Sequence, residues 1–122
     1  MGQSAKSMTV VIAEADPDLI NIITYALRPY SDNVQVARDG YEALMALEEI
    51  APALMIVDLN LPELSKSNLL EHLRYSGLRA ILTSSYSGRD IRDQLLPACT
   101  FVQKPFDLSR LRGAIDEQLA RA

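Results

Sequence analysis

The chain has 122 residues, 48% of them apolar and 23% charged, which suits one globular domain and excludes two independent cores. Twelve basic and sixteen acidic residues leave a formal charge of −4, which argues against direct nucleic-acid binding. A single cysteine, Cys99, and a single histidine, His72, exclude a disulfide framework and a Cys- or His-rich metal site. No apolar run has the length of a membrane span and no secretory signal is seen, so we expect a cytoplasmic domain without a membrane partner.

The pattern along the chain begins with a polar lead-in and then alternates strands with helices. Residues 1–8 are expected to be disordered, and residues 9–121 to form the domain. Thr9 to Ala13 is a continuous apolar run, as expected for a strand covered on both faces. Similar runs predict further strands over Val34–Ala37, Ala53–Val57, Ala80–Thr83 and Thr100–Gln103.

Helical spacing and capping residues fill the intervals between these strands. Asp16-Pro17 opens a helix that Pro29 ends, and Asp39-Gly40 opens a second. Leucines at helical spacing predict a third helix up to Gly77. A short helix near Ile91 to Leu96 and a last one capped by Asp107 complete the alternation.

Five strands alternating with helices predict an α/β fold, a doubly wound parallel sheet with helices on both faces. An eight-fold barrel is excluded by length. In such sheets, ligand sites form outside the carboxyl ends of the strands, so these ends are where functional residues are expected.

Polar side chains follow the predicted strands at that edge. Glu14 and Asp16 follow the first strand, and Asp58 and Asn60 follow the third. The fourth ends in Thr83-Ser84-Ser85 and the fifth in Lys104-Pro105, so the inventory comprises acids, hydroxyls and a lysine. Hard cations prefer oxygen ligands, and lysine and hydroxyl groups bind phosphate oxygens, so the edge resembles a phosphate or magnesium site.

These strand-end residues, together with VDLNLP around Asp58 and the closing VQKPFD, resemble the receiver domain of two-component response regulators. The resemblance covers Thr9 to Leu119 and depends on several motifs in the right order rather than on any one of them. It implies the flavodoxin-like (βα)5 fold with strand order 2-1-3-4-5.

The resemblance also implies roles for individual residues. Asp58 would accept a phosphoryl group from a histidine kinase or phosphotransfer protein. Mg²⁺ would be bound by Glu14, Asp58 and the backbone carbonyl of Asn60, with Asp16 as a further possible ligand.

Around the phosphoryl group, the resemblance assigns Ser84 as the switch hydroxyl, with Thr83 as the alternative if the register differs by one residue. Lys104 would pair with the phosphoryl oxygens, and its bond to Pro105 would be cis. Phe101 stands where the family carries a switch aromatic. Phosphorylation would then remodel the face formed by the helix near Ile91–Leu96, the fifth strand and the last helix.

Some of these residues have a simpler structural interpretation. Asp16 is favoured as a helix cap over a metal ligand, and Phe101 as a core residue. Ser84 is balanced between the site and a loop hydroxyl. His72 and Cys99 are interpreted as packing or surface residues rather than reactive groups.

One departure from the family pattern opens an alternative function. The family places two adjacent acids after the first strand, where this chain has Glu14 and Ala15. The main hypothesis is a phosphorylated receiver with a kinase and a downstream protein or output domain as partners, as a monomer or weak homodimer. It would not be an enzyme with its own substrate, apart from slow self-dephosphorylation. The alternative is a docking module that works without phosphorylation.

Enzyme classes are less compatible with the sequence. An aspartyl phosphatase would need a second aspartate where Asn60 stands, and neither a dinucleotide-binding glycine motif nor a P-loop is present.

Overall fold

The computed structural model describes residues 8–86 and 98–121. The helix predicted near Ile91–Leu96 lies outside these described residues, as do most of the expected lead-in residues. Every structural statement below concerns the described ranges.

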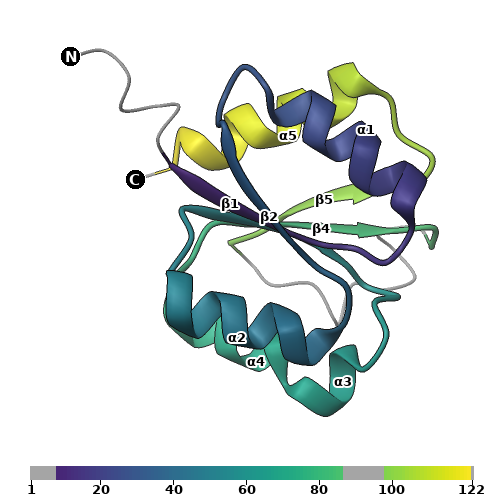
Figure 1. Cartoon of the computed structure of the whole chain (residues 1–122). Coiled ribbons are helices and arrows are strands. Elements are labelled where there is room, and N and C mark those ends of the chain that lie inside the picture. The colour runs from purple at the N-terminus through teal and green to yellow at the C-terminus, as the bar shows by residue number, and fades with distance from the viewer. Residues whose placement is uncertain (1–7, 87–97, 122) are drawn as a thin grey trace.

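A parallel sheet of five strands forms the middle of the molecule (Figure 1). Its order is β2-β1-β3-β4-β5, as predicted, and β1 pairs with both β2 and β3. The strands are β1 (Thr9–Ala13), β2 (Asn33–Ala37), β3 (Leu54–Asp58), β4 (Ala80–Ser84) and β5 (Thr100–Gln103). Their bounds differ from the predicted ones by at most one residue, and the differences place Asp58 and Ser84 inside their strands rather than just after them.

Helices cover both faces of this sheet. In Figure 1, α1 (Pro17–Leu27) and α5 (Leu108–Leu119) lie above it, and α2 (Gly40–Ile50), α3 (Leu64–Ser67) and α4 (Leu69–Ser76) lie below it. Successive strand residues point to opposite faces, so β1 contributes Val10 and Ile12 to the upper core and Val11 and Ala13 to the lower one. This double coverage explains why the central strands β1 and β3 are apolar at nearly every position, whereas the edge strand β2 carries Asn33 and Gln35.

The helix starts follow the predicted caps. The carboxylates of Asp16, Asp39 and Asp107 accept hydrogen bonds from backbone N–H groups in the first turns of α1, α2 and α5. The first helix ends at Leu27, two residues before the predicted stop at Pro29. No helix among the described residues has both the length and the apolar character needed to cross a membrane.

The segment after β3 contains a short helix, α3, that the sequence did not predict. Asn68 separates it from α4, with a left-handed backbone at φ 60°. The Ser67 hydroxyl donates to the Leu64 carbonyl at 2.8 Å and accepts from the Leu69 N–H at 3.2 Å. The serine hydroxyl satisfies backbone groups locally, and asparagine tolerates the left-handed backbone, so that one helix ends here and the next begins.

Candidate functional site

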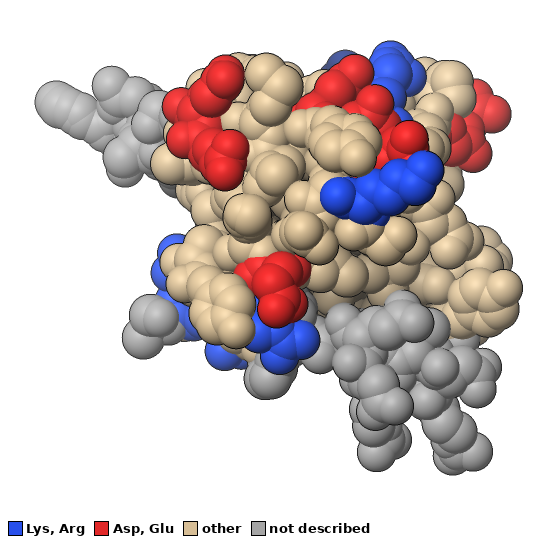
Figure 2. Space-filling view, turned by 90° about the horizontal axis from the view of Figure 1, so that it is seen from below, with Lys and Arg blue, Asp and Glu red and all other residues tan. Residues whose placement is uncertain are grey.

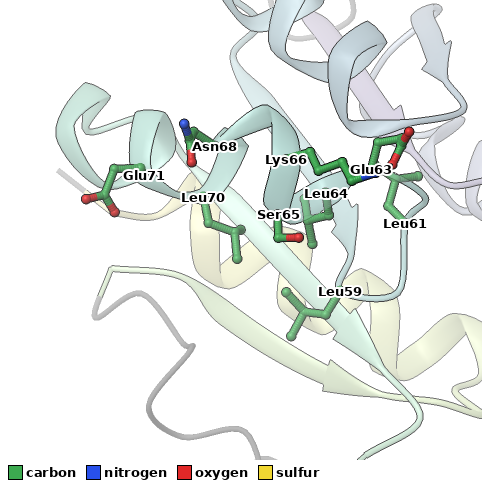
Figure 3. Close-up of a pocket in the computed structure, with 9 residues that line it drawn as sticks. All are labelled: Leu59, Leu61, Glu63, Leu64, Ser65, Lys66, Asn68, Leu70 and Glu71. Atoms are coloured by element: carbon green, nitrogen blue, oxygen red, sulfur yellow. Dashed lines mark ion pairs between the residues drawn. The ribbon is translucent and has the colours of Figure 1, made fainter.

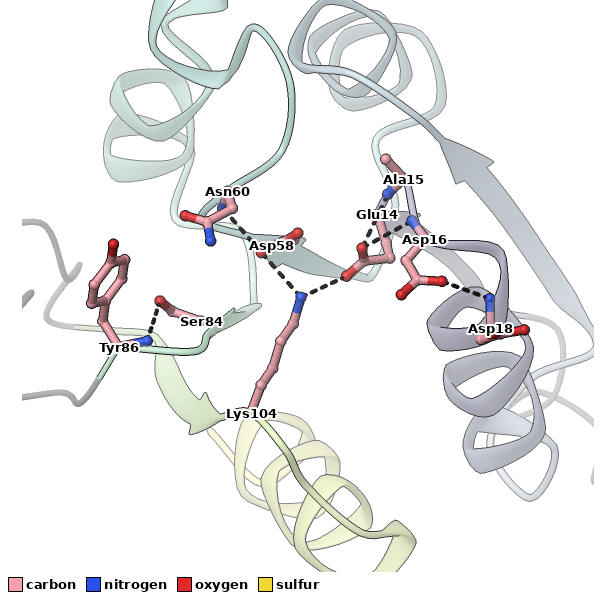
Figure 4. A network of polar contacts seen from close by, with 9 residues as sticks. All are labelled: Glu14, Ala15, Asp16, Asp18, Asp58, Asn60, Ser84, Tyr86 and Lys104. Carbon is pink, nitrogen blue, oxygen red and sulfur yellow. Dashed lines mark hydrogen bonds and ion pairs between the residues drawn. The ribbon is translucent and has the colours of Figure 1, made fainter.

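The carboxyl ends of β1, β3, β4 and β5 bring the predicted polar residues to one edge of the sheet (Figure 4). Asp58 is the last residue of β3, and its register partner on β4 is Thr83. Glu14 directly follows β1, which pairs with β3. The parallel register therefore places two acids from distant parts of the sequence on neighbouring strands.

Lys104 connects these two acids. Its ammonium Nζ lies 3.2 Å from Glu14 Oε1 and 3.3 Å from Asp58 Oδ1. The side chains of Lys104, Glu14 and Asp58 are only 17%, 4% and 8% exposed, respectively. A buried charge is unfavourable unless it is paired, so each acid depends on this ammonium. The backbone N–H of Lys104 donates to the Ser84 carbonyl at 2.7 Å, which fixes the start of the side chain.

Glu14 has both carboxylate oxygens engaged. Oε1 contacts Lys104, and Oε2 accepts the backbone N–H groups of Ala15 and Asp16, each at 3.1 Å. The carboxylate therefore stabilises the turn from β1 into α1 as well as the lysine. Sequence reasoning missed this second role, since the direction of backbone N–H groups in a turn leaves no pattern in the sequence.

The Asp58 carboxylate has fewer partners than that of Glu14. Its Oδ1 accepts the Asn60 N–H at 3.0 Å and contacts Lys104, so one oxygen carries both interactions. Among the described residues, no hydrogen-bond donor or ion-pair partner is found at Oδ2. Within the described residues, Asp58 thus combines one paired oxygen with one that has no protein partner, beside a positive charge.

The two hydroxyl candidates, Ser84 and Thr83, are both buried. Ser84 Oγ accepts the Tyr86 N–H at 3.0 Å, and Figure 4 shows its hydroxyl directed to that group. Thr83 lies opposite Asp58 in the strand register. Both side chains are at the correct edge, and the switch role of Ser84 stays a prediction.

Asp16, Phe101 and the Lys104–Pro105 bond complete the set of predicted residues. Asp16 Oδ1 accepts the Asp18 N–H at 2.9 Å, the helix-cap contact that the sequence favoured. Phe101 packs half-buried against the lower core. The Lys104–Pro105 peptide is cis, as predicted.

The donor set was compared with what Mg²⁺ requires. Mg²⁺ takes oxygen ligands in near-octahedral geometry, commonly with one or two carboxylates. Among the described residues, no group of three or more acidic, histidine or cysteine side chains could hold a metal ion. The position after Glu14 is Ala15, and the ammonium of Lys104 contacts both available acids. The predicted set of Glu14, Asp58 and the Asn60 carbonyl offers Mg²⁺ two carboxylates, both in contact with Lys104, and metal binding there stays a prediction.

A groove lies beside this site rather than over it. The loop after Asp58 and the helices α3 and α4 line a hollow of about 490 Å³, with Leu59, Leu64 and Leu70 among its walls (Figure 3). The Lys66 ammonium at its rim lies 3.5 Å from Glu63 Oε1. The groove is therefore lined by leucines and by an ion pair whose two charges compensate each other. Its described lining contains no cluster of reactive side chains.

Gly40, at the start of α2, is a second feature that the sequence did not assign to the site. Its N–H donates to the Pro62 carbonyl at 2.8 Å, and a Cβ at this position would collide with the Glu63 carbonyl. Since residues 59–63 form the loop that follows Asp58, the glycine permits α2 to pack directly against that loop.

Comparisons with known proteins identify the family. The response regulator receiver domain family matches residues 10–116. The transcriptional regulatory protein TrcR of Mycobacterium tuberculosis is 29% identical over 114 residues, covering 87% of this chain and 44% of the relative. The DNA-binding response regulator MtrA of Mycolicibacterium smegmatis is 29% identical over 117 residues, covering 92% and 50%. The chain thus spans about half the length of these curated relatives.

Solved structures support the fold. A response regulator from Thermotoga maritima matches with a TM-score of 0.77 and 22% identity, covering 94% of this chain and 99% of the other. A CheY-like receiver domain from Methylobacillus flagellatus matches with a TM-score of 0.74 and 19% identity, covering 91% and 98%. Together with the family match, the sheet order and the strand-end residues, these findings show that the chain belongs to the response regulator receiver domain family of two-component signalling.

Proposed function

We propose that Asp58 accepts a phosphoryl group from a phosphohistidine on a histidine kinase or phosphotransfer protein. The observation that carries this proposal is the uneven engagement of Asp58. One oxygen is fixed by Asn60 and Lys104, and the other has no partner among the described residues. A carboxylate held in this way is oriented for attack and lies beside a cation that can neutralise the incoming charge.

The reaction transfers the phosphoryl group without a redox change. Oδ2 of Asp58 forms the new O–P bond while the P–N bond to the donor histidine breaks. The bonding electron pair leaves with the imidazole nitrogen, and the histidine takes up one proton. Lys104 would pair with the transferred oxygens, since its ammonium already lies 3.3 Å from the same carboxylate. The Asn60 N–H would keep Oδ1 in place throughout.

The added phosphate would change the contacts of Ser84 and Lys104. Ser84 Oγ would leave the Tyr86 N–H and donate to the phosphoryl oxygens. The hydrogen bond from the Lys104 N–H to the Ser84 carbonyl joins the ends of β4 and β5. A movement of Ser84 or Lys104 would therefore also move β5, which contributes to one face of the domain together with α5. Slow hydrolysis of the acyl phosphate would reset the domain.

Partners and location are proposed at the level of the family. The phosphodonor would be a histidine kinase or phosphotransfer protein, and the receiver of the signal a downstream protein or output domain. With its net charge of −4, this domain would not contact nucleic acid itself. We propose a cytoplasmic location and a monomer or weak homodimer. Mg²⁺ remains an expectation from the family, and no step above depends on it.

The test is incubation with a small-molecule phosphodonor, acetyl phosphate, followed by intact mass measurement. The wild-type protein should gain one phosphoryl group, and Asp58→Asn should gain none. Asp16→Asn is the matched control, because it removes an acid from the same edge and should leave the modification intact. A phosphoryl group that persists in Asp58→Asn, or its absence in both proteins, would contradict the proposal.

A phosphorylation-independent docking module is the second candidate. Ala15 and the contact of Lys104 with both acids favour it, because each buried acid already has a cationic partner without phosphate or metal. It predicts no mass gain with acetyl phosphate, so the same experiment separates the two functions.

A further inference from the structure

A hollow of about 630 Å³ lies between α2 and α4 on the lower side of the sheet, and none of the candidate-site residues lines it. Its apolar lining includes Leu47 and Leu78, and beside them stands Tyr75, which is 79% exposed. Glu48 and Glu71 add two carboxylates to the lining. These five residues are called the acidic hollow below. A surface of this kind suits an aromatic or apolar group that carries positive charge beside it.

The two carboxylates of the acidic hollow are only partly compensated. Glu71 Oε1 lies 3.9 Å from Arg74 Nε, and both side chains are exposed, so this pair is weak. For Glu48, no ion pair is found in the described part of the chain. On the face that contains α2 and α4, Figure 2 shows separate groups of acidic side chains with uncharged residues between them. The acidic hollow therefore favours a positively charged occupant.

The upper side of the molecule presents the complementary chemistry. Ile22 and Tyr25 of α1 are 42% and 50% exposed. The guanidinium carbons of Arg28 and Arg112 lie 5.2 and 5.7 Å from the centroid of the Tyr25 ring, which is cation–π distance. For neither arginine is an ion pair found among the residues that the structure describes. These four residues are called the tyrosine face below.

The tyrosine face is held in its arrangement by contacts between α1 and α5. Arg112 Nε donates to the Ala26 carbonyl at 3.1 Å, and its Nη2 donates to the Tyr25 carbonyl at 3.4 Å. Asp116, an acid on the same helix as Arg112, accepts the Tyr30 hydroxyl at 2.8 Å. An aromatic ring that is already fixed beside two positive charges loses little conformational entropy when it is buried by a partner.

We propose that the tyrosine face of one copy of the chain docks in the acidic hollow of a second copy. The two surfaces are complementary in charge and in apolar character, and tyrosine and arginine are the side chains that most often anchor protein interfaces. They lie on opposite sides of the sheet (Figure 1), so the contact is head-to-tail and one copy can contact two others. The proposal goes beyond the proposed function and does not depend on Asp58.

The first experiment measures self-association by sedimentation velocity at low ionic strength. The average mass of the unmodified wild-type protein should rise between about 10 µM and about 1 mM. Arg28→Glu in the tyrosine face and Glu48→Arg in the acidic hollow should each weaken the association about tenfold. Both side chains are exposed, so the variants should keep the fold, which circular dichroism checks. Arg110→Glu is the matched control, because this exposed arginine of α5 belongs to neither surface, and it should associate like the wild type.

The second experiment mixes the two variants in equal amounts. Arg28→Glu keeps an intact acidic hollow and Glu48→Arg keeps an intact tyrosine face, so the mixture should recover association that neither variant shows alone. Association lost in only one variant would mean that two identical faces meet, and would overturn the head-to-tail contact. A mixture that does not recover, an equal loss in Arg110→Glu, or a wild-type protein that stays monomeric at about 1 mM would also overturn it, and would leave the acidic hollow to a different basic partner.

Discussion

The two acids at the edge of the sheet differ in how completely the fold engages them. In the β1–α1 turn, Glu14 has both oxygens occupied by Lys104 and two backbone N–H groups. At the end of β3, Asp58 uses one oxygen for Asn60 and Lys104. The comparison teaches that burial alone does not indicate reactivity, because a carboxylate can be buried as a structural anchor or as a group with one free oxygen. The predictions below test this difference.

The largest effect is expected from removing the anchor. Glu14→Ala removes one of the two ion-pair partners of Lys104 and leaves two N–H groups of the turn without their acceptor, which should lower the free energy of unfolding by about 3 kcal/mol. Asp58→Ala removes fewer contacts and should cost about 1 kcal/mol. Urea unfolding of both variants measures the difference, and an equal or reversed order would remove the distinction between the two acids.

Gly40 tests how the loop that carries Asn60 is supported. A Cβ at Gly40 would meet the Glu63 carbonyl and lie 2.6 Å from Ser67 Oγ, so Gly40→Ala should destabilise the domain by about 2 kcal/mol. Gly113→Ala is the matched control. A Cβ there meets nothing within 4 Å inside α5, so that variant should be neutral or more stable by about 0.5 kcal/mol. Thermal unfolding that showed no difference between the two would argue against the close packing of α2 on this loop.

Asp16 lies in the same turn as Glu14 but outside the ion cluster. Asp16→Ala removes the cap of α1 and should cost about 1 kcal/mol in urea unfolding. It should not alter the response of Asp58 to acetyl phosphate. A loss of phosphorylation in this variant would restore Asp16 as a ligand of the site.

Cys99 lies just before β5 begins, at the edge of the sheet opposite the candidate site, and serves as a control. Burial raises the pKa of its thiol to about 11, from an ordinary value of 9.0. At neutral pH, iodoacetamide should therefore alkylate the native protein about a hundredfold more slowly than the unfolded chain. A raised pKa stabilises the fold below pH 9, and this contribution should fade as the pH rises toward 11. Rapid alkylation of the native protein at pH 7 would show that the thiol is accessible.

Much of the architecture could be predicted because it depends on local patterns. The apolar runs that end at Ala13 and Val57 predicted two strands, and capping aspartates predicted helix starts. The short helix α3 could not be predicted in this way. Its ends depend on left-handed backbone at Glu63 and Asn68, which neither residue type specifies by itself.

The candidate site was predicted as a set of residues but not as a set of contacts. Parallel strands bring their carboxyl ends to one edge, so Glu14, Asp58 and Lys104 could be grouped from the sequence. That Lys104 contacts both acids, and that Glu14 also holds the turn, depends on side-chain directions set by packing. The choice between Thr83 and Ser84 has the same origin, since a register shift of one residue exchanges their faces.

The measurement that tests the central claim most directly is an amide NMR titration of the wild-type protein and Asp58→Ala with Mg²⁺ and then beryllofluoride, a phosphoryl mimic. If Asp58 offers its free oxygen to a phosphoryl group, beryllofluoride should cause saturable shifts at Asn60, Ser84 and Lys104 in the wild-type protein and none in the variant. The absence of a response in the wild-type protein, or the same shifts in Asp58→Ala, would contradict the account.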